Sequence, residues 1–204
     1  VVQANQMLLR DVVLDMRLRD GDLFVREFKT RKWGGTLKAK GNILAISPEL
    51  GTIRASGQFS YDGFEIDAQQ NNFALDFPLR QCLCSISSTF VADGASFASM
   101  IFSLDGKGSL KGENVVVKGL DISQLRDIMR RGQVDTDKIP ELLSEIKEGG
   151  YSEFSFMSGE FTITKGIVSF DELLWKGDGV TAISVGDINL PLWTMSLDNE
   201  ITIQ

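Results

Sequence analysis

The side chain that enzymes most often use to move protons is missing from this sequence. It has 204 residues and no histidine, which removes the Ser-His and Cys-His nucleophile pairs, the commonest general base and the commonest metal ligand. Asp171 and Glu172 are adjacent carboxylates on a predicted strand, so we expect them on opposite faces, where they cannot act at one centre. No spacing typical of a calcium loop occurs. The sequence therefore predicts no enzyme, no catalytic residue, no metal site and no cofactor.

One glycine-rich segment has some of the residues of a phosphate-binding loop. Gly106-Lys107-Gly108-Ser109 lacks the Walker spacing, and Lys111 stands where the dinucleotide pattern Gly-x-Gly-x-x-Gly needs its third glycine. A β-turn or bulge is the prediction here.

The two cysteines, Cys82 and Cys84, are separated by one residue. On a strand this spacing puts them on one face, with their Cα atoms near the upper limit of disulfide reach. A metal or redox pair would need further ligands that the sequence lacks. We therefore expect two small buried residues on an apolar face rather than a strained bridge. Their presence does not settle the compartment.

The charge balance argues against nucleic acid as a partner. Lys and Arg total 21 and Asp and Glu total 28, a net charge of −7, whereas phosphate binding needs a basic face. The most basic segment, 26–40, alternates its charges with Trp33, Leu37 and Ala39. We interpret it as the solvent side of strands, with a patch for phosphate or anionic lipid headgroups as the alternative.

Apolar and polar residues alternate through most of the chain, which is typical of half-buried strands. Turn signals such as Asp20-Gly21 and Asp62-Gly63 predict hairpins every 8–12 residues or so, the pattern of an antiparallel all-β fold. Pro78 argues for an edge or a strand end. The rows that share a face are Val12, Leu14, Met16 and Leu18; Ile53, Ala55, Gly57, Phe59 and Tyr61; Phe64, Ile66 and Ala68; Phe73, Leu75, Phe77 and Leu79; and Met100, Phe102 and Leu104.

The alternation gives way to helical spacing between residues 121 and 148. Asp121 or Ser123 is a suitable N-cap for a first helix that ends before Gly132, and a second helix is predicted over 137–148. Both are amphipathic, so each should lie against an apolar surface. We interpret this insertion as a lid on the sheet, with a membrane-surface helix as the alternative.

Segments 16–43 and 161–188 match one another at an offset of 145 residues, which suggests a duplicated β-unit. Apolar residues match in phase between two glycines that are 20 residues apart in each copy. The identical pairs are Gly21/Gly166, Glu27/Glu172, Gly34/Gly179, Thr36/Thr181, Gly41/Gly186 and Ile43/Ile188.

The second of these segments also carries a family resemblance. GEFTITKGIVSFDELLWKGDGVTAISVGDINL (159–190), with LDGKGSLKGENVVVKGLDISQLRDIM (104–129) before it, resembles the C-terminal region of the AsmA family. The shared pattern is a Gly-x-Gly strand, a short strand ending in Gly-Leu-Asp, a helix, and then Gly-punctuated strands. The segment 81–99 matches nothing in that pattern. The resemblance implies a bridge-type lipid-transfer protein, anchored in a bacterial inner membrane and reaching into the periplasm, with a role in phospholipid transport and outer-membrane biogenesis.

We therefore expect a mainly β, antiparallel sheet of about a dozen strands, curled into a taco-like groove, in one domain over residues 1–204, with the helical insertion at 121–148. Residues 1–9 show no signal-peptide pattern and no apolar run reaches the roughly 20 residues of a membrane span, so we expect a piece of a longer chain with its anchor elsewhere. The expected partner is a phospholipid or other acyl-chain lipid, and the alternative is a closed β-sandwich acting as a scaffold or protein-interaction module of the envelope. The residues expected to contact lipid are Val12, Leu14, Met16, Leu18, Ile53, Phe59, Phe64, Ile66, Phe73, Leu75, Phe77, Phe102, Phe161, Ile163 and Phe170.

Overall fold

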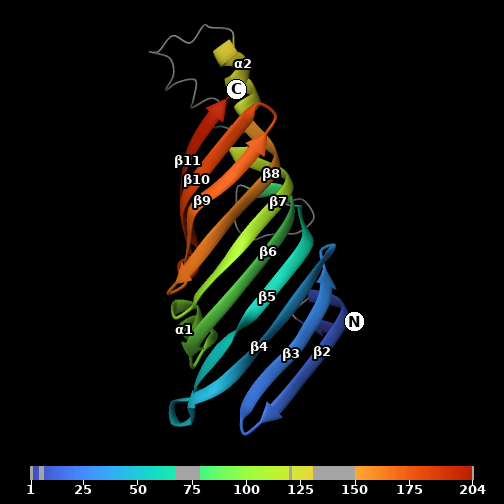
Figure 1. Cartoon of the computed structure of the whole chain (residues 1–204), viewed down its shortest axis with the longest axis vertical. Helices are drawn as coiled ribbons and strands as arrows, with labels where there is room; N and C mark the ends of the chain where they lie inside the picture. The colour runs from blue at the N-terminus through green and yellow to red at the C-terminus, as the bar shows by residue number, and fades with distance from the viewer. Residues whose placement is uncertain (1, 5–6, 68–78, 120, 131–149, 204) are drawn as a thin grey trace.

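In the part of the chain that the structure describes, eleven strands follow one another and pair in the same order (Figure 1). The computed structural model describes residues 2–4, 7–67, 79–119, 121–130 and 150–203. Two short helices, α1 (Phe97–Phe102) and α2 (Ile122–Arg130), and a 3-10 turn at Pro48–Leu50 accompany the strands. The strands are β1 (Val2–Ala4), β2 (Met7–Arg19), β3 (Asp22–Lys32), β4 (Gly35–Ser47), β5 (Thr52–Asp67), β6 (Leu79–Gly94), β7 (Asp105–Gly119), β8 (Gly150–Thr164), β9 (Ile167–Gly177), β10 (Val180–Asn189) and β11 (Thr194–Ile203).

Neighbouring strands are antiparallel throughout, so the predicted mainly β, antiparallel fold is confirmed. The described strands form one continuous sheet that is not closed, so the alternative of a closed sandwich is wrong. The predicted curled groove is also wrong, because the sheet as a whole is twisted and neither closed nor strongly curled (Figure 1). Only its C-terminal strands turn back over one end of the sheet. Alternating apolar residues share a face in a twisted sheet as well as in a curled one, so the pattern carried no information about curvature.

One face of the sheet is apolar, and its rows run across the strands. Residues directly opposite in an antiparallel ladder lie on the same face. A central row shows this, because it joins β4 to β8 through successive pairings. We call the side of the sheet that carries this row the apolar face and the other side the polar face. The row consists of Ala39, Phe59, Ser88, Gly108 and Phe161, with the ring of Phe161 lying over Gly108.

A β-bulge stands where a hairpin was predicted at Asp62-Gly63. The strand β5 continues to Asp67, and its pairing with β6 shifts between Tyr61 and Phe64. Gly63 has φ 65°, a conformation that glycine adopts without strain, and its N–H donates to the Ser85 hydroxyl at 3.0 Å. Because Asp62 and Gly63 stand opposite Ser85 alone, this one extra residue keeps both Tyr61 and Phe64 on the apolar face, where their rings stack with centroids 4.2 Å apart.

The two segments of the predicted repeat have the same arrangement of turns and bulges. Each runs from the end of one strand through a hairpin, a second strand, another hairpin and a third strand. In the first copy the pairs Val25–Gly41 and Phe28–Ala39 flank a bulge, and in the second the pairs Phe170–Gly186 and Leu173–Ser184 flank another. Every one of these positions is related by the offset of 145 residues. Gene duplication as the origin of this likeness stays a prediction.

The helices agree only in part with the sequence pattern. The N-cap prediction for α2 is confirmed, since the Asp121 carboxylate accepts a hydrogen bond from the N–H of Gln124 at 2.9 Å. The strand expected through Met100 and Phe102 is wrong: both residues lie in α1, because Ser96 and Ser99 form a capping box that starts a helix. The second predicted helix, at 137–148, lies outside the described residues, as do Phe73, Leu75 and Phe77.

Candidate functional site

The apolar face divides into an accessible part and a covered part. On β2, Leu14, Met16 and Leu18 have exposed fractions of 47%, 52% and 73%. On β8 and β9, Phe161, Ile163 and Phe170 have exposed fractions of 5–8%. The predicted lipid-contact residues are therefore not equivalent, because those on β2 form an open apolar surface of the sheet and those on β8 and β9 do not.

Between these extremes lies a band of half-buried residues on β2 and β5. Val12, Ile53, Phe59, Phe64 and Ile66 belong to it. Phe64 and Ile66 pack against the buried cluster, whereas Phe59 makes a tilted ring contact with Phe90 at 6.4 Å between centroids. Phe102 is separate from the rows, because it lies in α1 with 59% of its surface exposed.

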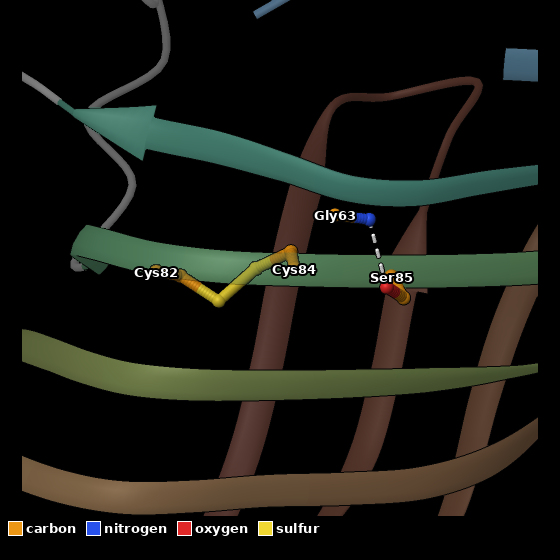
Figure 2. Close-up of a disulfide and its surroundings, with 4 residues drawn as sticks. All are labelled: Gly63, Cys82, Cys84 and Ser85. Carbon is orange, nitrogen blue, oxygen red and sulfur yellow. Dashed lines mark hydrogen bonds between the residues drawn. A yellow bond between two sulfur atoms is a disulfide. The ribbon is translucent and has the colours of Figure 1, made fainter. Parts of the chain in front are cut away.

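The covered part is a single cluster that extends from β6 to β10, with side chains of β5 and β11 packed against it. Side chains as buried as those of this cluster must have other atoms packed over the apolar face as well as neighbours within it. In Figure 2, strands in the colours of the C-terminal end cross behind β5 to β8. The members of the cluster fit this arrangement, because they come from both groups of strands. This end of the sheet thus seals its own apolar face, while the β2 end leaves it open.

A disulfide joins Cys82 to Cys84 on β6 (Figure 2). Both residues are buried, as predicted, but the expectation that they would not be bridged is wrong. Alternate residues of a regular strand are about 6.6 Å apart, whereas these Cα atoms are 5.4 Å apart, within disulfide reach. Register shifts in the β6–β7 ladder between Leu79 and Leu83 accompany this shortening. A Cβ at Gly112 would lie 2.9 Å from the Cys82 Sγ, so this glycine leaves room for the bridge.

The polar face carries a cleft with a volume of about 1030 Å³. Two rows of side chains border it, running across the strands on either side of the central row. The first row pairs Lys38, Ser60, Ser87, Ser109, Glu160 and Glu172, and the second pairs Lys40, Gln58, Thr89, Lys107, Thr162 and Ser169. Of these residues, only Lys38 and Lys40 belong to the segment 26–40 that we interpreted as the solvent side of strands. The sequence does contain a signal for these two rows, because lysine, hydroxyl and glutamate side chains recur at the same positions of the alternation on successive strands.

Asp171 and Glu172 both line this cleft. The expectation that they lie on opposite faces is wrong, because they form the bulge in β9 between Phe170 and Leu173. Those two apolar residues are both buried on the apolar face, so the two carboxylates between them both point the other way. Glu172 is also directly opposite Glu160 on β8.

Tyr61 and Asp93 are among the groups on the sheet whose pKa values are displaced. Burial raises the pKa of Tyr61, whose hydroxyl donates to the Lys32 carbonyl at 2.7 Å. Hydrogen bonding to Arg54 is the main cause that lowers the pKa of Asp93. Neither group has the pairing of acid, base and nucleophile that an active site needs.

Among the described residues, no group of three or more acidic, cysteine or histidine side chains is placed to hold a metal ion. Within the same ranges, no helix is both long and apolar enough to cross a bilayer. No family model, no curated protein and no solved structure matches the chain. The resemblance to the AsmA family, the compartment and the lack of enzymatic activity therefore stay predictions.

Proposed function

We propose that this chain is a non-enzymatic lipid-binding module that takes part in phospholipid transfer in the bacterial envelope. The observation that carries the proposal is the accessible apolar surface on β2, formed by Leu14, Met16 and Leu18. These side chains stand on one face in alternate positions and continue into the half-buried band on β3 to β5. An apolar patch left open along a row of strands is typical of a surface that binds apolar partners.

The mechanism would be passive. Acyl chains would lie along the apolar rows, across the strands, and each Å² of apolar surface removed from water would contribute about 25 cal/mol. Headgroups would stay at the edge of the sheet in solvent. Such a surface distinguishes lipids weakly, because the hydrophobic effect is not directional. Transfer of phospholipid between membranes is the role that the resemblance to AsmA-family proteins adds.

The disulfide supports an extracytoplasmic location. Disulfides persist in oxidising compartments such as the bacterial periplasm and are rare in the cytosol. The bridge between Cys82 and Cys84 is buried in the core cluster, away from reductants in solution. We infer the periplasm as the compartment, with any anchor in the inner membrane supplied by segments outside this sequence.

A matched pair of variants on β2 tests the proposal. Leu14 and Val13 are neighbours with the same exposed fraction, 47%, and they face opposite sides, since Leu14 pairs with Phe28 and Val13 with Lys29. Leu14→Asp should weaken binding of a fluorescent phospholipid at least about tenfold, because an acyl chain there would desolvate a carboxylate. Val13→Asp should leave the affinity within about twofold.

Purified protein should also carry phospholipid that solvent extraction and mass spectrometry detect. Equal loss of lipid binding in both variants, with the far-UV circular dichroism of each unchanged, would show that the apolar face is not the binding surface. Protein free of lipid that binds no labelled phospholipid would contradict the proposal as a whole.

A protein-interaction module is the second candidate, and the polar cleft favours it. The cleft is lined with lysine, hydroxyl and carboxylate groups, which suit a polar partner and not an acyl chain. Lys38→Glu with Lys40→Glu should leave phospholipid binding unchanged if the apolar face binds lipid. A loss of phospholipid binding in this variant would mean that the lipid headgroup binds to the polar face.

A further inference from the structure

The two ends of the sheet are unpaired strand edges. β1 pairs only with Met7–Leu9 of β2, so residues 10–19 of β2 have no neighbour on their outer side among the described strands. Within the same described residues, no strand pairs with the outer side of β11, Thr194–Ile203. These edges lie at opposite ends of the sheet (Figure 1), and free edges of this length are templates for further pairing.

The direction of the strands makes the two edges compatible with one another. Nine successive antiparallel pairings lead from β2 to β11, so β11 runs opposite to β2. A second copy in the same orientation would therefore present its β2 antiparallel to β11 of the first. The meander would continue without a change of direction, and the apolar faces of both copies would lie on the same side.

The charges on the polar side of each edge are complementary. Arg17 and Arg19 lie on β2, and Asp198 and Glu200 lie on β11. Both carboxylates are on the polar face, because the alternate residues Leu197 and Ile201 pair with Gly186 and Ala182 of the apolar face.

One register satisfies both faces at once. If Arg19 is placed opposite Asp198, then Arg17 stands opposite Glu200. On the apolar face the same register puts Met16 opposite Ile201 and Leu14 opposite Ile203. Shifting the strands by two residues in the direction that lengthens the overlap would instead put Asp15 opposite Glu200, and like charges directly opposite are destabilising.

Arg17, Asp198 and Glu200 make no ion pair with any other residue in the described ranges, and the contact of Arg19 is with the adjacent Asp20 at 3.2 Å, on the exposed hairpin. The charged groups at both edges are therefore available to a partner strand.

We propose that β11 of one copy pairs with β2 of the next, residues 198–203 against 14–19, so that copies associate head to tail into a longer sheet. The contact is heterologous and does not close on itself, so it leads to open chains of copies and not to a symmetric dimer. Six residues on each strand bury less than a standard interface, so association requires high protein concentration. The proposal does not depend on lipid binding, although the longer sheet would extend the apolar face.

Sedimentation of the chain over a range of concentrations tests this assembly. The mean mass of the unchanged protein should rise with concentration, and added salt should reduce the rise, because exposed ion pairs are screened. Arg17→Glu with Arg19→Glu should stay monomeric, and so should Asp198→Arg with Glu200→Arg. An equimolar mixture of these two double variants should associate again, because each supplies the edge charge that the other lost. Lys111→Glu with Lys118→Glu, away from the edges and outside the polar cleft, should behave like the unchanged protein.

Cysteine pairs test the register and keep a weak association measurable. Arg17→Cys combined with Glu200→Cys should give oxidised chains of two, three and more copies. Arg17→Cys combined with Asp198→Cys, two residues out of register, should give at least about tenfold less cross-linked product. A mean mass that stays monomeric at every concentration together with absent cross-linking, or a mixture of the charge variants that fails to associate, would overturn the proposal.

Discussion

At the scale of single residues, the best-defined polar contact of the sheet is the ion pair between Arg54 and Asp93. The two residues are directly opposite on β5 and β6 and make two hydrogen bonds, Nε to Oδ1 at 2.7 Å and Nη2 to Oδ2 at 2.6 Å. The Asp93 pKa is lowered below 3.8, mainly by the hydrogen bond, and the same bond raises the pKa of Arg54. The contribution of the pair to stability is therefore present above 3.8 and is lost as the pH falls through the lowered pKa.

Arg54→Gln should return the pKa of the Asp93 carboxyl toward its ordinary value of 3.8. The reason is that glutamine keeps a donor but removes the charge and the two-pronged geometry of the guanidinium. Carboxyl carbon shifts followed by NMR as the pH is lowered would measure it. An unchanged Asp93 titration in the variant would show that Arg54 is not the cause.

The disulfide gives a second prediction at this scale. The bridge closes a loop of only three residues, so the chain-entropy estimate of its contribution to the free energy of unfolding is about 1.6 kcal/mol. Chemical unfolding of oxidised and reduced protein should differ by about that amount. In the denatured protein without reductant, a thiol reagent should find no reactive cysteine. Two reactive thiols under those conditions would contradict the bridge.

At the scale of strands, close approach of neighbouring backbones requires glycine at two equivalent places in the repeat. A Cβ at Gly41 would collide with the Ser56 carbonyl on β5, and one at Gly186 would collide with the Ser196 carbonyl on β11. Gly41→Ala and Gly186→Ala should each lower the free energy of unfolding by about 1–3 kcal/mol, because the strands would have to move apart. Gln58→Ala, an exposed change beside Gly57, should alter it by less than about 0.5 kcal/mol. Urea unfolding measures all three, and tolerance of alanine at both glycines would contradict the shared geometry.

The strands also show where local sequence stops being informative. Asp20-Gly21 and Asp62-Gly63 are the same dipeptide between alternating apolar residues, yet the first is a hairpin turn and the second a bulge inside β5. The difference lies in the partner strand, since Phe64 continues along β6 by pairing with Cys84. That partner is far away in the sequence, so a local pattern cannot specify it. Asp171 and Glu172 share a face for the same reason.

At the scale of the whole molecule, alternation predicted an antiparallel sheet with one apolar face, and the sheet has that face. The same rows did not predict which part would be covered. Leu14 and Phe161 lie in one row of directly opposite residues that crosses from β2 to β8. Leu14 is nevertheless exposed and Phe161 buried, because the C-terminal strands cross over their own end of the sheet. Twist accumulates over many strand pairs, so the residues of one row cannot predict the twist of the whole sheet. The polar cleft depends on the same long-range geometry.

The central claim is that one face of β2 receives acyl chains and the other does not. A photo-crosslinking residue placed in turn at positions 13 to 18, with the protein incubated with phospholipid vesicles, measures this directly. The account predicts crosslinks to lipid from 14, 16 and 18 and at most background from 13, 15 and 17, following the alternation of faces along the strand. Equal labelling at all six positions, or labelling confined to 13, 15 and 17, would contradict it.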